Sequence, residues 1–245
     1  MSSNVAQPSP FARIATTYST IADIAVAPKS GAGDKAFSGS IVVALLTLVA
    51  LAYLGTVLEH PVTEKVIHMA ILKQLHDHST GSGENAAAMG ERLTAVYTRI
   101  VPIVGLVMLL VQQFVGAGLM SLAVLMLNGR ANYRKMLYIF AHTSVLTVGL
   151  AQLGAGIIHA LQGPAAYDTS LSMMLSIPSA AWLVNTSPQA QVIAAAINPF
   201  TLWQVAILAL WLAHAARLPV ARALVAACVP LVLFTALAAM YANGS

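Results

Sequence analysis

Five long blocks of apolar residues dominate this chain, separated by shorter segments in which polar residues gather. A helix of roughly 17–25 apolar residues crosses the hydrocarbon core of a bilayer, and each block reaches that length. The pattern predicts five transmembrane helices, at about residues 41–58, 101–127, 136–161, 200–216 and 220–241. We therefore expect an N-terminal segment, 1–39, followed by a five-helix transmembrane domain, 40–245.

The N-terminal segment 1–39 carries a second kind of pattern. Apolar side chains recur there three and four positions apart, as they do along one face of an amphipathic helix. The spacing predicts a helix that lies on the membrane surface. The apolar positions are Phe11, Ile14, Tyr18, Ile21 and Ala25.

The outer loops, 59–100 and 162–199, are patterned as well. In 59–100, Pro61 is placed to begin a helix, and two amphipathic stretches follow. Loop 162–199 is apolar and broken by Pro178 and Pro188, which predicts short interfacial helices. The fold class expected is thus an all-α integral membrane protein with five spans and amphipathic interfacial helices. The apolar positions of loop 59–100 are Val62, Val66, Met69 and Leu72, then Met89, Leu93, Val96 and Ile100.

Composition agrees with this pattern and excludes a soluble protein. Hydrophobic residues make up 58% of the chain and charged residues only 8%, against roughly 25% charged residues in soluble domains. The net charge of +4 does not indicate nucleic acid, because Lys and Arg lie beside the apolar blocks and form no basic patch.

Lysine and arginine are distributed unevenly among the segments outside the spans. The N-terminal segment and the links between spans two and three and between spans four and five hold eight of the 12 Lys and Arg residues, with two of the 8 acids. The remaining segments hold four basic residues and six acids. Because positive segments stay in the cytoplasm, we expect an inner-membrane protein with a cytoplasmic N-terminus and a C-terminus outside, in the periplasm.

The start of the fourth span carries a resemblance to a known family. It reads Asn198-Pro199-Phe200, then two further residues and Trp203. A phenylalanine-x-x-tryptophan stretch opening a late span, behind an amphipathic N-terminal segment, resembles the bacterial branch of the Yip family of five-span proteins, named for interaction with Ypt/Rab GTPases. The Asp-Leu-Tyr-Gly-Pro signature of the eukaryotic branch is absent. The resemblance implies a five-helix bundle without a family-wide catalytic residue, in the company of ABC-type or adaptor export systems.

Ionisable residues within a membrane usually mark function, and the interiors of the predicted spans contain no Asp, Glu, Lys or Arg. An ion-coupled carrier normally needs a carboxylate at mid-depth, so the chain alone is not expected to be one. His142 and His214 lie toward the cytoplasmic ends of spans three and four. They could share hydrogen bonds or hold the iron of haem b. His159 lies near the outer end of span three, at the expected interface.

Uncharged polar and small residues in the spans predict contacts between helices. Gln152 and Gln204 can hydrogen-bond across helix pairs, and glycines such as Gly154 and Gly156 allow close approach. We expect no metal site, because the histidines of loop 59–100 show no i, i+4 pair. No hydrolase elbow, phosphate loop or zinc-protease motif is present, so neither a catalytic residue nor an enzyme is expected.

The function that these patterns favour is that of a non-catalytic membrane protein of Yip type. It would act as a scaffold or accessory subunit of a larger transport or secretion assembly, packing against lipid and other membrane proteins and binding no nucleic acid and no cofactor. Two alternatives remain open: a subunit of a membrane redox complex that holds haem through His142 and His214, and a small-solute channel or carrier.

Overall fold

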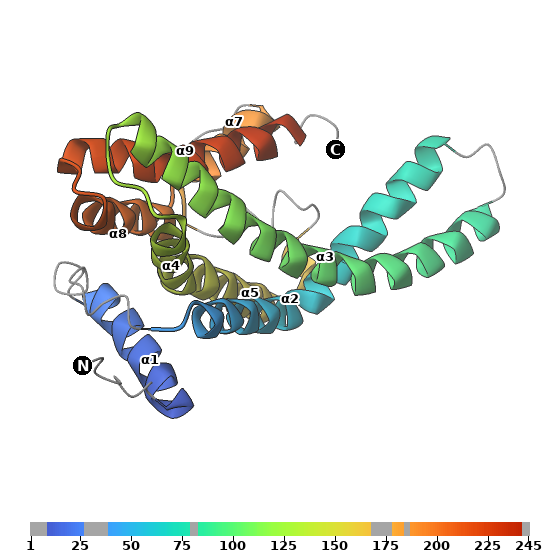
Figure 1. Ribbon diagram of the computed structural model, residues 1–245. Coiled ribbons are helices and arrows are strands. Elements are labelled where there is room, and N and C mark those ends of the chain that lie inside the picture. Colours follow the sequence, from blue (N-terminus) through green and yellow to red (C-terminus); the bar gives the residue numbers. More distant parts are fainter. Residues whose placement is uncertain (1–8, 27–38, 79–82, 168–177, 184–186, 242–245) are drawn as a thin grey trace, which may run out of the picture. The chain divides into compact units, whose positions relative to one another are not determined.

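The computed structural model describes residues 9–26, 39–78, 83–167, 178–183 and 187–241, and every regular element within them is helical (Figure 1). The N-terminal half forms α1 (Pro10–Val26), α2 (Ile41–His78) and α3 (Gly83–Met126). The third apolar block forms α4 (Tyr133–Ser144), a π-helical turn η3 (Val145–Gly149) and α5 (Leu150–Gln162). The remainder forms η4 (Pro164–Ala166), η5 (Ala180–Leu183), α7 (Pro188–Ala195), α8 (Pro199–Ala215) and α9 (Val220–Tyr241).

Four of the described helical stretches are long and apolar enough to cross a bilayer. The α8 helix reaches this standard only together with α7, from which it is bent by 51°. The all-α membrane class is therefore confirmed, with four candidate spans or five if the bent pair is one span, and the five-span count stays a prediction. The four stretches are Ile41–Gln74, Ala88–Met126, Tyr133–Gln162 and Val220–Met240.

The α2 helix continues far beyond the first apolar block. Pro61 lies inside it, so the prediction that this proline begins a separate helix was wrong. An interior proline removes one backbone hydrogen bond and costs about 3 kcal/mol. The residues next to it provide packing that offsets this loss, because Val62 and Val66 are buried in one cluster with Tyr167. The 38 residues of α2 measure about 57 Å at the usual helical rise, longer than a bilayer core.

The residues group into two compact units, and the first comprises Met1–Leu48, Gln113–Thr147 and Trp203–Val232. Its core contains large, fully buried side chains from α3, α4 and α8. The helices α8 and α9 fold back on each other through a short turn (Figure 1). This turn contacts the segment that follows α3, because Arg130 N donates to Ala216 O over 3.0 Å. The largest of the core side chains are Met120, Met136, Ile139, Ile207, Leu208, Trp211 and Leu212.

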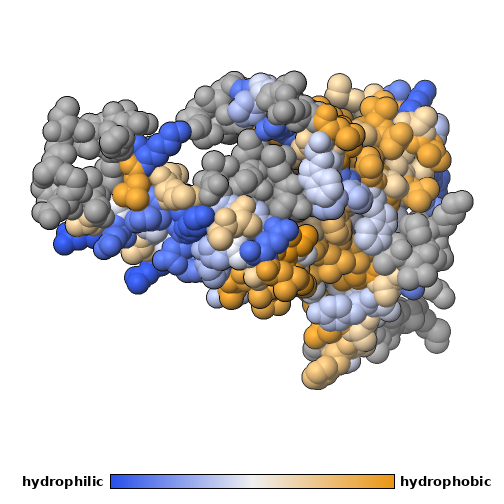
Figure 2. Space-filling model, turned by 180° about the vertical axis from the view of Figure 1, so that it is seen from behind, coloured by the Kyte–Doolittle hydropathy of each residue, from blue (hydrophilic) through white to orange (hydrophobic). Residues whose placement is uncertain are grey.

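The second unit comprises Val49–Gln112, Val148–Leu202 and Leu233–Ser245. Within it, α2 and α3 are the two arms of a helical hairpin (Figure 1). A hydrogen bond between His68 Nδ1 and Thr94 Oγ1, 3.1 Å long, joins the arms. In Figure 2, hydrophilic side chains lie along one side of this hairpin. The arms thus bond to each other through polar side chains.

Candidate functional sites in the two units

Buried threonines hold α1 against its neighbours in the first unit. Thr17 and Thr20 are buried, and Thr17 Oγ1 accepts a 2.9 Å hydrogen bond from Ser40 N, just before α2 begins. The hydroxyl of Tyr138, on α4, accepts from Gly39 N over 3.3 Å and also bonds the Thr20 side chain. These five residues, which we call the α1 junction, connect α1 to the start of one candidate span and the side of another.

His142 lies next to the α1 junction and is wholly buried. Its Nδ1 lies 2.9 Å from Tyr138 O, and its ring stacks on that of Tyr138 with centroids 3.9 Å apart. Nδ1 therefore donates to the carbonyl, which leaves Nε2 as an acceptor. A Cβ added to Gly39 would lie 3.3 Å from this Nε2, so the nitrogen faces backbone at close range.

The two histidines of the haem alternative occupy different environments in this structure. His142 is enclosed by Tyr138 and Gly39, while His214 is exposed on α8. An axial ligand needs Nε2 to face a space large enough for a porphyrin, and Nε2 of His142 faces Gly39. The geometry favours a packing role for His142.

The α1 junction leads to a first prediction. Thr17→Val keeps the size of the side chain and removes the acceptor of Ser40 N, which leaves a part-buried donor unpaired at a cost of about 1 kcal/mol. We expect faster amide hydrogen exchange throughout α1. Thr16→Val is the matched control, because the Thr16 hydroxyl donates only within its own helix, to Ala12 O. Equal exchange in the two variants would contradict the assigned role of Thr17.

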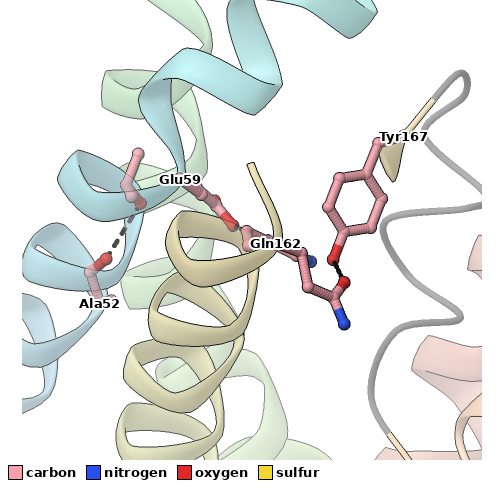
Figure 3. Close-up of polar contacts among 6 residues, drawn as sticks. Ala52, Glu59, Gln162 and Tyr167 are labelled. Atoms are coloured by element: carbon pink, nitrogen blue, oxygen red, sulfur yellow. Dashed lines mark hydrogen bonds and ion pairs between the residues drawn. The ribbon is translucent and has the colours of Figure 1, made fainter. Parts of the chain in front are cut away.

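The second unit contains a buried pair of ionisable groups, Glu59 and His159 (Figure 3). The Oε2 of Glu59, on α2, lies 3.0 Å from Nδ1 of His159, on α5, and the two side chains are 14% and 5% exposed. His159, expected at the interface, is thus buried against an acid. A buried charge needs a partner of this kind, since desolvation of an unpaired one is costly.

Polar contacts continue from this pair into the segment after α5. The ring of Tyr167 lies edge-on to that of His159, with centroids 5.0 Å apart, and its hydroxyl donates to Gln162 Oε1 (Figure 3). Lys65 Nζ donates to the carbonyls of Pro164 and Tyr167, each over 3.0 Å. These bonds hold the segment 164–167 to both α2 and α5. We call the residues involved, Glu59, Lys65, His159, Gln162 and Tyr167, the structural lock.

Glycines allow α2 and α5 to come close enough for this lock to form. A Cβ added to Gly156 would lie 2.4 Å from Gly55 O, and one added to Gly55 would lie 2.5 Å from Gln152 O. Both distances are shorter than any real contact of a Cβ, so only glycine fits. The backbones therefore touch one helical turn before Glu59 meets His159. Gln152 lies at this contact through its carbonyl, and its side chain is half-buried.

The other predicted residues have local roles. Asn198 caps α8, because its Oδ1 accepts from Thr201 N over 3.0 Å, and Pro199 occupies the first helical position, which proline favours. Phe200 and Trp203 are half-buried on that helix. In the first unit, Gln204 Nε2 donates a long bond of 3.5 Å to Ser144 Oγ, directly before η3. A π-helical turn of this kind is common near functional positions in helices.

Sequence reasoning did not single out Glu59, Lys65 or Tyr167. Glu59 directly follows the first apolar block and was counted with the loop. One signal was present: Glu59 lies four positions after Gly55, and His159 lies three after Gly156. Residues three or four apart share a helix face, so each ionisable residue lies on the face of its helix that also carries a glycine.

The fold and these sites define a class of protein: a multi-span, all-α integral membrane protein whose polar side chains join its own helices. Residues 22–241 match the family model of the Yip1 domain. Because the match covers most of the chain, the protein belongs to the Yip1 domain family. No curated protein and no solved structure matched the chain.

Proposed function

We propose that this member of the Yip1 domain family is a non-catalytic scaffold or accessory subunit of a larger membrane assembly for transport or secretion. ABC-type or adaptor export systems are the partners that we favour. The proposal rests on how α3 is buried. Only 17% of the most apolar window of α3 is buried within the protein, compared with 44% for α4–α5. Most of the apolar surface of α3 is therefore available to lipid or to a partner protein.

The first half of α3 strengthens this interpretation. It turns Gly90, Thr94 and Thr98 inward, where they are buried. Val96 and Ile100 face outward, and each is 50% exposed. An amphipathic helix usually buries its apolar side, and here the small and polar side is buried instead. The apolar stripe, defined as Met89, Val96, Tyr97 and Ile100, is suited to receive a partner helix.

The proposed orientation is a cytoplasmic N-terminus and an outer C-terminus in the inner membrane. Two basic links support it, because the segments after α3 and after α8 contact each other in the first unit. Arg130 N bonds Ala216 O, and Arg222 Nη1 lies 3.5 Å from Leu127 O. Alternating spans would put both links on one side, and positive links stay in the cytoplasm.

Photo-crosslinking in native membranes tests the contact surface. A photoreactive residue at Ile100 should give an adduct with a component of an export system, while the same residue at the buried Thr98 should give none. Ile100→Lys should reduce recovery of that component in mild detergent by about tenfold or more, corresponding to ~1.4 kcal/mol. Adducts with lipid alone at Ile100 would contradict the scaffold proposal.

The alternatives have different outcomes in the purified protein. A reduced-minus-oxidised haem band that is lost in His142→Ala would replace the scaffold proposal with the redox one. Solute flux through vesicles that contain only this chain would favour a channel or carrier. The scaffold proposal expects neither signal and expects an identified membrane partner in the same preparation.

A further inference from the structure

The α1 helix has three distinct sides. One side is buried and carries Thr17, Thr20 and Ile21. A second side is exposed and polar and includes Asp23. The third side is exposed and apolar, with Phe11 84%, Tyr18 50% and Ile14 40% exposed. We call the third side the apolar face of α1. Ile21, predicted on the same face, lies at its edge and is buried beside Thr17.

The apolar face lies beside the start of a candidate membrane span. The hydroxyl of Tyr18 lies 3.2 Å from Thr47 Oγ1 on α2. Since the Thr47 hydroxyl already donates to Val43 O over 2.8 Å, Tyr18 is the donor. Thr17 meanwhile accepts from Ser40 N, next to the first residue of α2. Thr17 and Tyr18 therefore place the middle of α1 against the start of this span.

The same turns of α2 expose apolar side chains. Val42 and Leu46 are each 64% exposed, in a helix of which Ile41–Gln74 is a candidate span. Exposed apolar residues on a membrane span face lipid, because the hydrocarbon core is their only stable surroundings apart from protein. Tyr18 bonds Thr47 on the same two turns, so the apolar face of α1 lies beside a part of α2 whose exposed side chains are apolar.

We propose that the apolar face of α1 binds the phospholipid bilayer at the boundary between headgroups and acyl chains. The α1 junction orients this face, because the buried threonines rotate Phe11, Ile14 and Tyr18 away from the protein. Tyr18 is suited to the boundary, with an apolar ring and a hydroxyl that bonds α2. Asp23 lies about 120° around the helix from Phe11 at 100° per residue, which directs it toward water.

Spin labelling tests this proposal with one label at a time. In a Cys228→Ser background, which removes the only cysteine, Phe11→Cys and Asp23→Cys each receive a nitroxide. The full chain is placed in vesicles of phosphatidylcholine and phosphatidylglycerol. Power saturation then measures collision with oxygen, which concentrates in lipid, and with a nickel chelate, which stays in water. Both positions are exposed, so neither label displaces a packed side chain.

The expected result is a ratio of oxygen to nickel accessibility several-fold higher at Phe11 than at Asp23. Ile14→Cys, on the same face, should follow Phe11. Equal ratios at Phe11 and Asp23 would show that the apolar face is in water and would overturn the proposal. Low accessibility to both reagents at Phe11 would show that protein covers the face, which would also overturn it.

Discussion

Gly156→Val is expected to lower the free energy of unfolding by about 3 kcal/mol or more, one of the two largest effects expected for this protein. Overpacking a close contact typically costs 1–3 kcal/mol and more where the neighbour cannot move. At Gly156 the neighbour is backbone, since an added Cβ would lie 2.4 Å from Gly55 O. Separation of α2 from α5 would also lengthen the bond between Glu59 and His159. SDS-induced unfolding and gel filtration in mild detergent measure the loss.

The chain offers a matched control on the same helix. A Cβ added to Gly154, two residues earlier, meets nothing within 4 Å. Gly154→Val should therefore change the free energy of unfolding by less than about 1 kcal/mol, through helix propensity alone. If the two valine variants lost equal stability, the cause would be that α5 does not tolerate valine in general. The close contact at Gly156 would then not explain the loss. The contact predicts that Gly55→Ala is damaging too, because its Cβ would lie 2.5 Å from Gln152 O.

The second large effect is expected at the buried ionisable pair. His159→Leu removes the partner of Glu59, whose side chain is only 14% exposed. Breaking a buried pair by removing one member costs about 3–5 kcal/mol, while replacing both members by apolar residues is often neutral. We therefore expect Glu59→Leu combined with His159→Leu to regain much of the stability that His159→Leu loses. Unfolding in SDS again provides the measurement.

An exposed pair of the same residue types serves as the reference. His60 and Glu64 lie 3.9 Å apart on α2, and their side chains are 52% and 56% exposed. His60→Leu should cost less than about 1 kcal/mol, as exposed pairs do. A double variant at Glu59 and His159 no more stable than His159→Leu would mean that packing around His159, and not its pairing with Glu59, stabilises the unit.

The elements could be predicted from the sequence to different extents. The apolar blocks of α2, α3, α4–α5 and α9 identified four candidate spans, because length and hydropathy are properties of each segment by itself. The helical period also found α1. It did not find which side of α1 is buried, because the bonds of its threonines to Ser40 and Tyr138 depend on other segments of the chain.

The partners of the polar side chains could not be predicted from one segment alone, because each contact joins two segments. Gln204 does bond another helix, through Ser144, as a glutamine inside a span would be expected to do. Gln152 meets its neighbour through backbone instead. The end of the first span was placed before Glu59, since a charged residue normally ends an apolar run. The continuous α2 helix carries Glu59 to His159, a hundred positions along the chain.

The sequence by itself determined that this is an all-α membrane protein. Its few charges cannot cover the surface of a soluble protein, and its long apolar segments can satisfy their backbone hydrogen bonds in lipid as helices. Its layout and the stretch from Asn198 to Trp203 pointed to the Yip family, and the family match over residues 22–241 agrees. Only the tertiary structure decided that Glu59 pairs with His159 and that Gly55 meets Gly156. Hydropathy is a property of one segment, whereas a contact depends on how two helices are rotated and aligned against each other.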